Sequence, residues 1–352
     1  MPESPEQAFA RYQRALASDP RQLDVRLKAA AILSAHEYRL DAIQLLLEGF
    51  PHAPRDPRLR AALVGALDSF PLDEASPAVR EVLLDLCWDD DIATQALADA
   101  VIGLALHSEE FAQLQAELDA GAAQELARDH LLQAILSRAI INDAALERVL
   151  TRLRRAVLLE GLTLDPAFIE ALAQQCFNNE YAWFVTPEES AALPNAASEA
   201  GAMYRPGAKQ AAQLAEEASL ARTIEAITPI RTGVSSEVRE MYEENPYPRW
   251  LTLMRPRPIS IAEGAPRSVL IAGGGTGQHP LYTALSFPES EVLVVDLSRA
   301  SLAYATRMAQ RYRADNLRFR QADILELGSL GQRFDLIESF GVLHHLQDPL
   351  AG

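Results

Sequence analysis

The sequence predicts a molecule in two parts, an α-helical array followed by a partial parallel α/β sheet with flanking helices. Over residues 1–180, apolar side chains recur at helical spacing and β-branched alternation is scarce. From Ser268 onward, short β-branched runs alternate with helical stretches. Apolar strands separated by helices are typical of a parallel sheet covered on both faces.

The helical part begins with a repeat-like segment. Ala8 and Ala15 are small enough to let a neighbouring helix approach, Tyr12 fills the groove between them, and Pro20 stops the helix. Pro20 and Pro54 are 34 residues apart, which is the period of the tetratricopeptide (TPR) repeat. The segment therefore resembles the start of a TPR array.

Further helices are expected to follow in an irregular array. Asp165 caps one of them, and Thr186 with Glu189 three residues later caps another. The others are expected at 25–35, 38–50, 58–70, 76–87, 91–106, 122–141 and 144–159. Residues 194–207, rich in Ala, Ser, Pro and Gly, are expected to form a mobile loop. We assign residues 1–228 to this domain and expect a packing scaffold, or alternatively a groove that recruits a protein substrate or partner.

The second part starts after a linker and lid segment at 229–267 and covers residues 268–352. We expect strands at 268–272, 291–295, 317–321 and 334–338. Helices are expected at 280–286 and 298–313.

A glycine-rich turn after the first expected strand is the strongest functional signal. Gly273, Gly275 and Gly277 follow a buried strand and precede a helix near Pro280. Glycines let a ligand lie against bare backbone, and the helix N-terminus offers unpaired N–H groups. Gln278 stands where a dinucleotide fingerprint requires Gly or Ala, and the Gly-Lys-Ser/Thr of a P-loop is absent.

Two carboxylates follow the next two strands. Asp296 closes the second strand, 19 residues after Gly277, where a carboxylate can accept two hydrogen bonds from ribose hydroxyls. The alternative, a helix cap, is disfavoured because Ser298 can serve as that cap. Asp323 follows the third strand in the same way.

In order and spacing, these motifs and the fourth strand resemble the class I S-adenosyl-L-methionine (SAM)-dependent methyltransferases over residues 268–349. The resemblance implies a Rossmann-like fold and SAM as the cofactor. It implies that the three glycines approach the methionine part of SAM and that Asp296 binds the ribose. It also implies that Asp323 binds the adenine amino group, with Ile324 against the ring.

The segment from Tyr242 to Trp250 resembles the N-terminal lid of some small methyltransferases. Together with residues 175–181, it resembles uncharacterised bacterial proteins that join TPR-like helices to this domain. We expect Tyr242 or Tyr247 to close over the cofactor, and the alternative is an aromatic plug that packs the segment onto the sheet. Nucleic-acid amino-methyltransferases carry an Asn-Pro-Pro-Tyr motif after an apolar strand. The Asn-Pro-Tyr at 245–247 lacks the second Pro and the preceding strand, so we do not assign it to that class.

His344 and His345 come just after the fourth strand. One of them could act as general base toward an acceptor hydroxyl or amine. The alternative is that both only shape the pocket, because positioning can supply much of the catalysis of methyl transfer.

No third ligand stands at a familiar zinc spacing, and Cys87 and Cys176 lie far apart. We therefore expect no metal site, and two buried, reduced thiols.

Composition restricts the location and partners. The net charge is −17 and Lys and Arg form no cluster, which disfavours nucleic acid as a partner. No apolar run of membrane-spanning length and no signal peptide are found, so we expect a cytoplasmic protein without a membrane partner.

The sequence ends after the fourth strand, where the resembled fold continues. We expect a fragment of a longer enzyme, and the alternatives are an oligomer that completes the sheet edge or a degenerate enzyme.

The sequence thus predicts a SAM-dependent methyltransferase that acts on a protein or a small molecule, with helices that recruit or regulate. One alternative is a non-catalytic TPR-like interaction protein with a vestigial SAM-binding domain. A nicotinamide-dependent oxidoreductase would suit Asp296 but not the glycine spacing.

Overall fold

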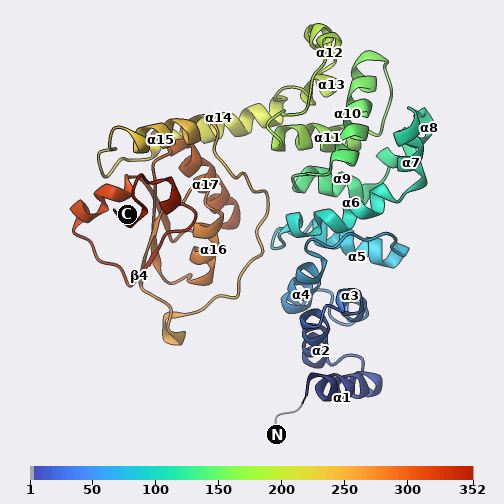
Figure 1. Cartoon of the computed structure of the whole chain (residues 1–352), viewed down its shortest axis with the longest axis horizontal. Helices are drawn as coiled ribbons and strands as arrows, with labels where there is room; N and C mark the ends of the chain where they lie inside the picture. Colours follow the sequence, from blue (N-terminus) through green and yellow to red (C-terminus); the bar gives the residue numbers. More distant parts are fainter. Residues whose placement is uncertain (1–3, 352) are drawn as a thin grey trace. The chain divides into compact units, whose positions relative to one another are not determined.

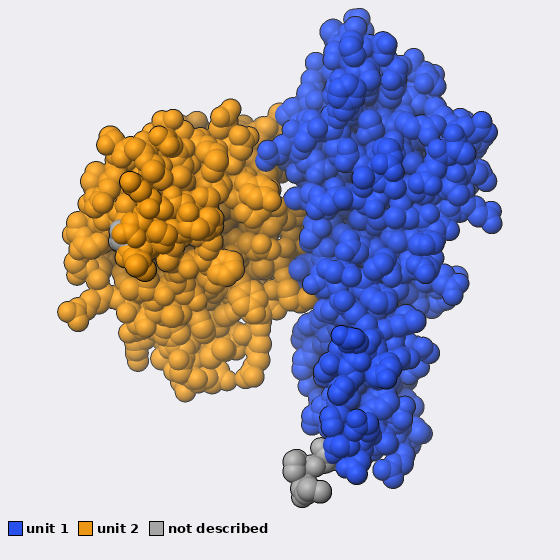
Figure 2. Space-filling view, viewed as in Figure 1, with its two compact units in different colours: residues 1–207 blue, residues 208–352 orange. Residues whose placement is uncertain are grey.

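The computed structural model describes residues 4–351 and divides the chain into two compact units, residues 1–207 and 208–352 (Figure 2). The boundary lies earlier than the expected one at 228. The reason is helix α14 (Ala208–Thr223), which packs against α17 (Arg299–Tyr312). Glu217 of α14 also pairs with Arg249 and Arg307, so this helix belongs to the second unit.

The described part of the first unit is helical (Figure 1). Many of its helices begin at a side-chain cap: Asp165 accepts a hydrogen bond from Ala167 N, and Thr186 forms a capping box with Glu189. Both predicted caps are confirmed. The helices are α1 (Pro5–Ser18), α2 (Leu23–Ala35), α3 (Arg39–Leu47), α4 (Pro57–Leu67), α5 (Pro77–Cys87), α6 (Ala98–Leu106), α7 (Glu109–Ala116), α8 (Ala120–Ala127), α9 (His130–Arg138), α10 (Ala144–Leu159), α11 (Pro166–Asn178), α12 (Pro187–Ala192) and α13 (Ser198–Ala202).

Three stretches of this unit differ from expectation. The single helix expected at 122–141 is two helices, because the Asp129 side chain accepts from Leu131 N and Leu132 N and starts α9. Helix α7 was not expected. The loop expected at 194–207 contains α13 and, after it, the buried Met203 and Tyr204; the Tyr204 hydroxyl donates to Glu189 at 2.7 Å.

Helices α1 to α4 pack in succession, as expected for the start of a helical array. Arg26 of α2 is buried and donates to the carbonyl of Leu45 at 2.6 Å and of Pro20 at 2.9 Å. These bonds tie the turn before α2 and the end of α3 to one side chain. The TPR character of these helices stays a prediction.

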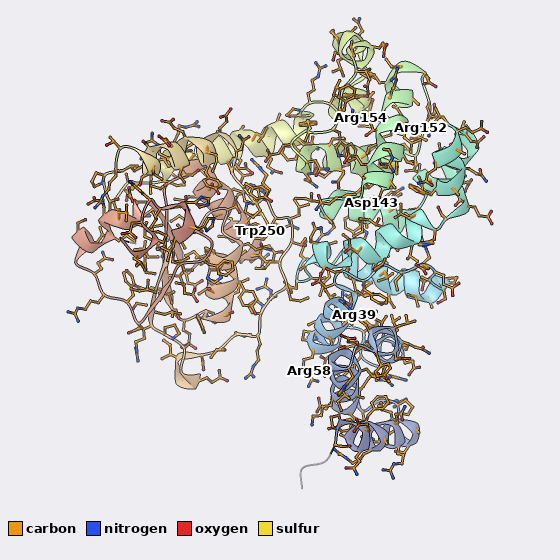
Figure 3. All side chains as sticks on the ribbon, in the orientation of Figure 1. Arg39, Arg58, Asp143, Arg152, Arg154 and Trp250 are labelled. Carbon is orange, nitrogen blue, oxygen red and sulfur yellow. The ribbon has the colours of Figure 1, made fainter. Side chains whose placement is uncertain are left out.

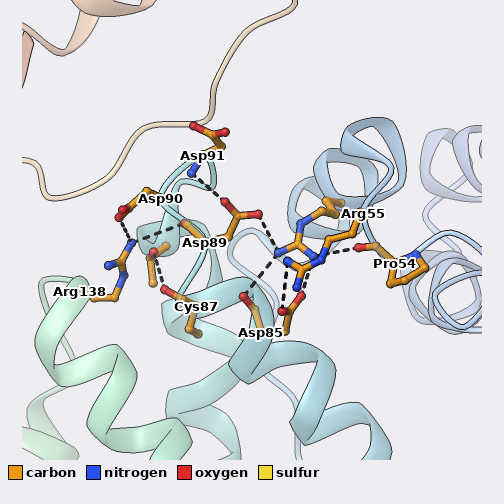
Figure 4. Close-up of polar contacts among 10 residues, drawn as sticks. Pro54, Arg55, Asp85, Cys87, Asp89, Asp90, Asp91 and Arg138 are labelled. Atoms are coloured by element: carbon orange, nitrogen blue, oxygen red, sulfur yellow. Dashed lines mark hydrogen bonds and ion pairs between the residues drawn. The ribbon is translucent and has the colours of Figure 1, made fainter. Parts of the chain in front are cut away.

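Buried arginines hold the later helices together. Arg60, 4% exposed, lies 2.6 Å from Asp85 and 2.7 Å from Asp89, and Figure 4 shows the acidic residues of this cluster with Arg55 and Arg138. Cys87 lies beside the cluster and, like Cys176, is a buried free thiol. Burial raises the pKa of Cys87 to about 12 and that of Cys176 to about 11. Both cysteines are therefore buried free thiols, as predicted.

The second unit contains a parallel sheet in the order β3-β2-β1-β4. All four expected strands are present, and only β4 starts two residues later than predicted. Helix α16 joins β1 to β2, and α17 joins β2 to β3. The elements are β1 (Ser268–Ala272), α16 (Gln278–Ser286), β2 (Glu291–Asp296), β3 (Leu317–Gln321) and β4 (Leu336–Glu338).

The two faces of this sheet are covered differently. Alternate residues of β1 point to opposite faces: Val269 and Ile271 pack in the main core with α16 and α17, whereas Leu270 and Ala272 join a smaller cluster. A short 3-10 segment, Ile324–Leu330, also contributes to that smaller cluster. Because β4 lies beside β1 and not beside β3, the strand order reverses at β1.

The stretch before the expected linker extends the sheet. Ile227 N donates to Gln321 O at 2.9 Å, and Gln321 N donates to Glu225 O at 2.8 Å. This pairing covers the β3 edge, which explains why residues 224–228 belong to the second unit. Among residues 4–351, no helix is long and apolar enough to cross a membrane.

Candidate cofactor site

A cavity of about 500 Å³ opens at the carboxyl ends of β1 and β2. Its walls are the glycine turn 273–277, the end of β2 at 295–297, helix α15 (Val234–Glu244) and the turn 340–346 after β4. Ligands of open α/β sheets bind where the strand order reverses. The cavity lies at that point, and its volume is in the range of small-molecule sites.

The glycine turn and Asp296 lie side by side. Gly275 N donates to Asp296 Oδ2 at 2.8 Å. Gly275 has φ +51, and a Cβ there would meet no atom within 4 Å. At Gly277, with φ +87, a Cβ would lie 2.4 Å from the Cβ of Ala305. Gly277 therefore permits close helix packing, whereas Gly275 leaves open space beside a carboxylate.

Backbone hydrogen bonds fix the orientation of the Asp296 carboxylate, and burial makes its negative charge unfavourable. Its Oδ1 accepts from Ser298 N at 2.9 Å, while the Ser298 hydroxyl caps α17 as expected. Burial raises the pKa of Asp296, backbone hydrogen bonds from Ser298, Gly275 and Leu297 oppose that shift, and Glu243 adds to it. A carboxylate with incomplete solvation favours a ligand that brings hydroxyl donors.

Asp323 does not line the cavity, in contrast to its expected contact with adenine. Its side chain is fully buried. Oδ1 accepts from Leu325 N at 3.0 Å and Oδ2 accepts from Arg231 N at 3.0 Å. The carboxylate thus fixes the chain before α15 onto the end of β3. Ile324, its neighbour, does line the cavity.

The predicted lid residues line the cavity together with the paired histidines. The Tyr242 hydroxyl lies 3.2 Å from His345 Nε2. Tyr247 is 70% exposed but still borders the cavity. The rings of His344 and His345 are 4.0 Å apart. Burial and the neighbouring His344 lower the pKa of His345, so its imidazole stays neutral over a wider range of pH.

Trp250, labelled in Figure 3, anchors the lid segment to the glycine turn. It is 6% exposed, and its Nε1–H donates to Thr276 O at 2.9 Å. The Thr276 hydroxyl in turn donates to Pro248 O. Tyr304 of α17 donates its hydroxyl to Trp250 O. The segment before β1 is thereby held against both the turn and α17.

Sequence reasoning missed several residues of the site. Glu243 accepts from Arg299 N at 2.8 Å and Ala300 N at 2.9 Å, which caps α17 from α15. His279 and Phe340 also line the cavity, and Glu338 contacts His279. The signal for His279 was its place two residues after Gly277, in the first turn of α16. No local pattern indicates Glu243, because its partners are distant in sequence.

Comparisons with known proteins fit this geometry. Residues 269–351 match a family described as a methyltransferase domain. An uncharacterised protein of Synechococcus sp. (strain ATCC 27144 / PCC 6301 / SAUG 1402/1) is 41% identical over 90 residues, which cover 25% of this chain. The match spans only 21% of that relative's length.

A solved structure of coclaurine N-methyltransferase, bound to N-methylheliamine and SAH, aligns with 55% of this chain and 54% of its own. Its identity is 16% and its TM-score is 0.20, so this likeness carries no argument about fold or acceptor.

Residues 269–351 are therefore similar to a methyltransferase domain, and S-adenosyl-L-methionine is the cofactor expected of such a domain. When bound, SAM supplies a methyl group activated on a sulfonium. The residues present fit this group: Gly275 offers open backbone, and the partly desolvated Asp296 offers acceptors for ribose hydroxyls. Ile324 offers an apolar surface for a flat ring.

Proposed function

We propose that this chain binds SAM in the cavity and transfers the methyl group to a protein or small-molecule acceptor. The observation that carries the proposal is the 2.8 Å contact between Gly275 N and Asp296 Oδ2. It joins the two strongest sequence signals at one point of the fold. Asp296 then holds the ribose, the glycine turn accommodates the methionine part, and Ile324 packs on adenine.

The residues around the cavity mouth have proposed roles in positioning the acceptor. Tyr242, linked to His345, covers the cavity from α15. His344 and His345 shape the wall near the transferred methyl, and an imidazole nitrogen of either could accept a proton from the acceptor. For the Asp323 carboxylate to bind the adenine amino group, it would have to release its hydrogen bond from Arg231 N and accept one from adenine instead.

We also propose that the helical unit recruits a protein acceptor or a partner in the cytoplasm. A groove of about 900 Å³ lies among α1, α2 and α3. It is lined by apolar side chains such as Phe9, Leu33 and Tyr38, and Tyr38 is 60% exposed. Helical arrays commonly bind partners through such surfaces.

The test is transfer of tritium from methyl-labelled SAM to a cell extract separated into macromolecular and small-molecule fractions. We expect label in one fraction with the wild-type chain. Asp296→Asn should lower the transfer at least about tenfold, since a hydrogen bond to a charged group contributes about 1.5–3 kcal/mol. The matched control, Asp315→Asn, changes an exposed carboxylate of the same unit and should transfer normally. SAM binding without transfer to either fraction would favour a vestigial domain.

A further inference from the structure

A carboxylate–histidine pair lies at the junction of the glycine turn and β4. His279 is in the first turn of α16, and Glu338 is the last residue of β4. The register of the parallel pair β1–β4 sets Glu338 opposite Ile271, close to the start of the glycine turn. His279 Nε2 lies 3.1 Å from Glu338 Oε2, and the Thr283 hydroxyl donates to the same oxygen at 3.0 Å.

These contacts favour one tautomer of the neutral His279 ring. An ionised carboxylate only accepts hydrogen bonds, so Nε2 must carry the proton that faces Glu338. In the neutral ring, Nδ1 is then the acceptor. Within residues 4–351, Nδ1 makes no hydrogen bond. The ring also stacks on Phe340, with centroids 5.8 Å apart and planes at 26°.

The pair differs from the predicted histidines in its surroundings. His279 lines the same cavity as Gly275 and Asp296. Its Nε2 is held by a carboxylate, whereas His345 Nε2 contacts a tyrosine hydroxyl at 3.2 Å. A carboxylate partner orients an imidazole and stabilises the imidazolium that forms when it takes a proton. Of the three cavity histidines, His279 has the better arrangement for a base.

On the proposed function, we propose that His279 is the general base for methyl transfer and that Glu338 is its positioning residue. The acceptor carries an N–H or O–H group. Its lone pair forms the bond to the methyl carbon, the carbon–sulfur bond breaks with its electron pair kept by sulfur, and the acceptor proton passes to His279 Nδ1. Glu338 stabilises the resulting imidazolium.

The cavity lining also restricts the acceptor. Among the described residues that line it, none is Lys or Arg, and aromatic side chains, Tyr242, Tyr247 and Phe340, stand around it. An anionic group beside the reacting atom would find no Lys or Arg side chain there. The acceptor is therefore an uncharged or amine-bearing group flanked by apolar or aromatic surface, and not a phosphorylated or carboxylated one.

The first measurement needs neither cofactor nor acceptor. Histidine 15N NMR of the whole chain, with His279 assigned by His279→Ala, reports which ring nitrogen is protonated. We expect the neutral ring to be protonated at Nε2 in the wild type. Glu338→Leu should weaken this preference to that of the exposed His52, with Glu338→Ala as the substitute if the leucine variant does not fold. A wild-type ring protonated at Nδ1 would overturn the proposal.

The second measurement repeats the tritium-transfer assay of the proposed function, with the fraction of the extract that takes up label as the acceptor. His279→Ala should lower kcat by about 100-fold, the lower range for a general base, with KM for SAM changed less than about threefold. Added imidazole should restore part of the rate, which a purely structural role would not allow. Glu338→Gln should lower kcat at least about tenfold. His52→Ala, an exposed histidine of the first unit, is the control.

The outcomes separate this inference from the proposed function. If the wild type and His279→Ala transfer the methyl group at the same rate, the methyltransferase function is supported and the assignment of His279 as base is wrong. If His279→Ala loses SAM affinity and imidazole restores nothing, His279 is structural and the assignment also falls. If the wild type fails to bind SAM, the proposed function itself fails.

Discussion

At the scale of single residues, the site depends on backbone left bare beside one carboxylate. Gly275 and Gly277 both have positive φ, but only Gly277 packs against another atom where its Cβ would be. Asp296 is held by backbone N–H groups, including those of Gly275 and Ser298, and is still short of solvation. Binding and stability can therefore be separated by substitutions at these positions.

Gly275→Ala should impair SAM binding more than folding. The added methyl enters open cavity space, and positive φ costs an alanine about 1–2 kcal/mol. We expect SAM affinity to fall at least about tenfold by calorimetry, while Tm falls by only a few degrees. Gly264→Ala is the matched control, because Gly264 also has positive φ (+98) and open surroundings but does not line the cavity. Equal losses of affinity in both variants would contradict the assignment.

The pH dependence of SAM affinity should follow Asp296. Its folded-state pKa lies above the ordinary value of 3.8, chiefly because of burial. A raised pKa means that the folded, cofactor-free chain takes up this proton as pH falls, and the protonated carboxyl accepts hydrogen bonds less well. Affinity should therefore be full well above that pKa and decline as pH is lowered through it. Titrations at successive pH values should show this decline in the wild type and not in Asp296→Asn.

At the scale of elements, the lid segment depends on Trp250. The residues before β1 have little secondary structure of their own, and the indole joins them to the glycine turn and to α17. The turn's shape and the lid's position are thus coupled through one side chain. A buried carbonyl that loses its donor costs about 1–3 kcal/mol.

Trp250→Phe should therefore lower both stability and SAM affinity. We expect about 1–3 kcal/mol less free energy of unfolding for the second unit, because Thr276 O loses its partner without solvent to replace it. Denaturant titration measures the stability, and calorimetry measures the affinity. Trp88→Phe, at an indole 55% exposed, should change neither by a comparable amount. An unchanged SAM affinity in Trp250→Phe would contradict the coupling of the lid's position to the shape of the glycine turn.

The elements also show what the sequence could predict. Strands β1 to β3 were predicted to within a residue because each is an apolar run next to Gly, Asp or a helix cap. Gly275 and Asp296 were identified for the same local reasons. The His279–Glu338 contact joins residues 59 apart, and the bond from Arg231 N to Asp323 joins residues 92 apart. Such contacts depend on strand order and on the path of the linker, which no local pattern encodes.

At the scale of the whole molecule, the chain consists of two compact units with separate cores. In the first, Arg154 is fully buried between helices (Figure 3). It donates to Phe184 O at 2.7 Å, lies 3.7 Å from Glu189, and its guanidinium is 4.3 Å from the Tyr204 ring centre. Completion of the exposed β4 edge by another chain stays a prediction.

Arg154→Met should destabilise the first unit and leave the second unchanged. Removal of one partner of a buried ion pair costs about 3–5 kcal/mol. Scanning calorimetry should show two transitions, of which the variant lowers one and SAM raises the other. The control Arg155→Met alters an exposed pair with Glu188, 43% and 68% exposed, and should cost less than about 1 kcal/mol. A single transition shifted by both the variant and SAM would contradict independent units.

The most direct test of the account is calorimetric titration of the whole chain with SAM. If the glycine turn and Asp296 hold this cofactor, one molecule should bind per chain with a Kd near about 1 μM, a free energy of about −8 kcal/mol. Asp296→Asn should weaken that binding at least about tenfold, and Asp315→Asn should not. Absence of saturable heat with the wild-type chain, or equal affinity in both variants, would contradict the assignment of this cavity to SAM.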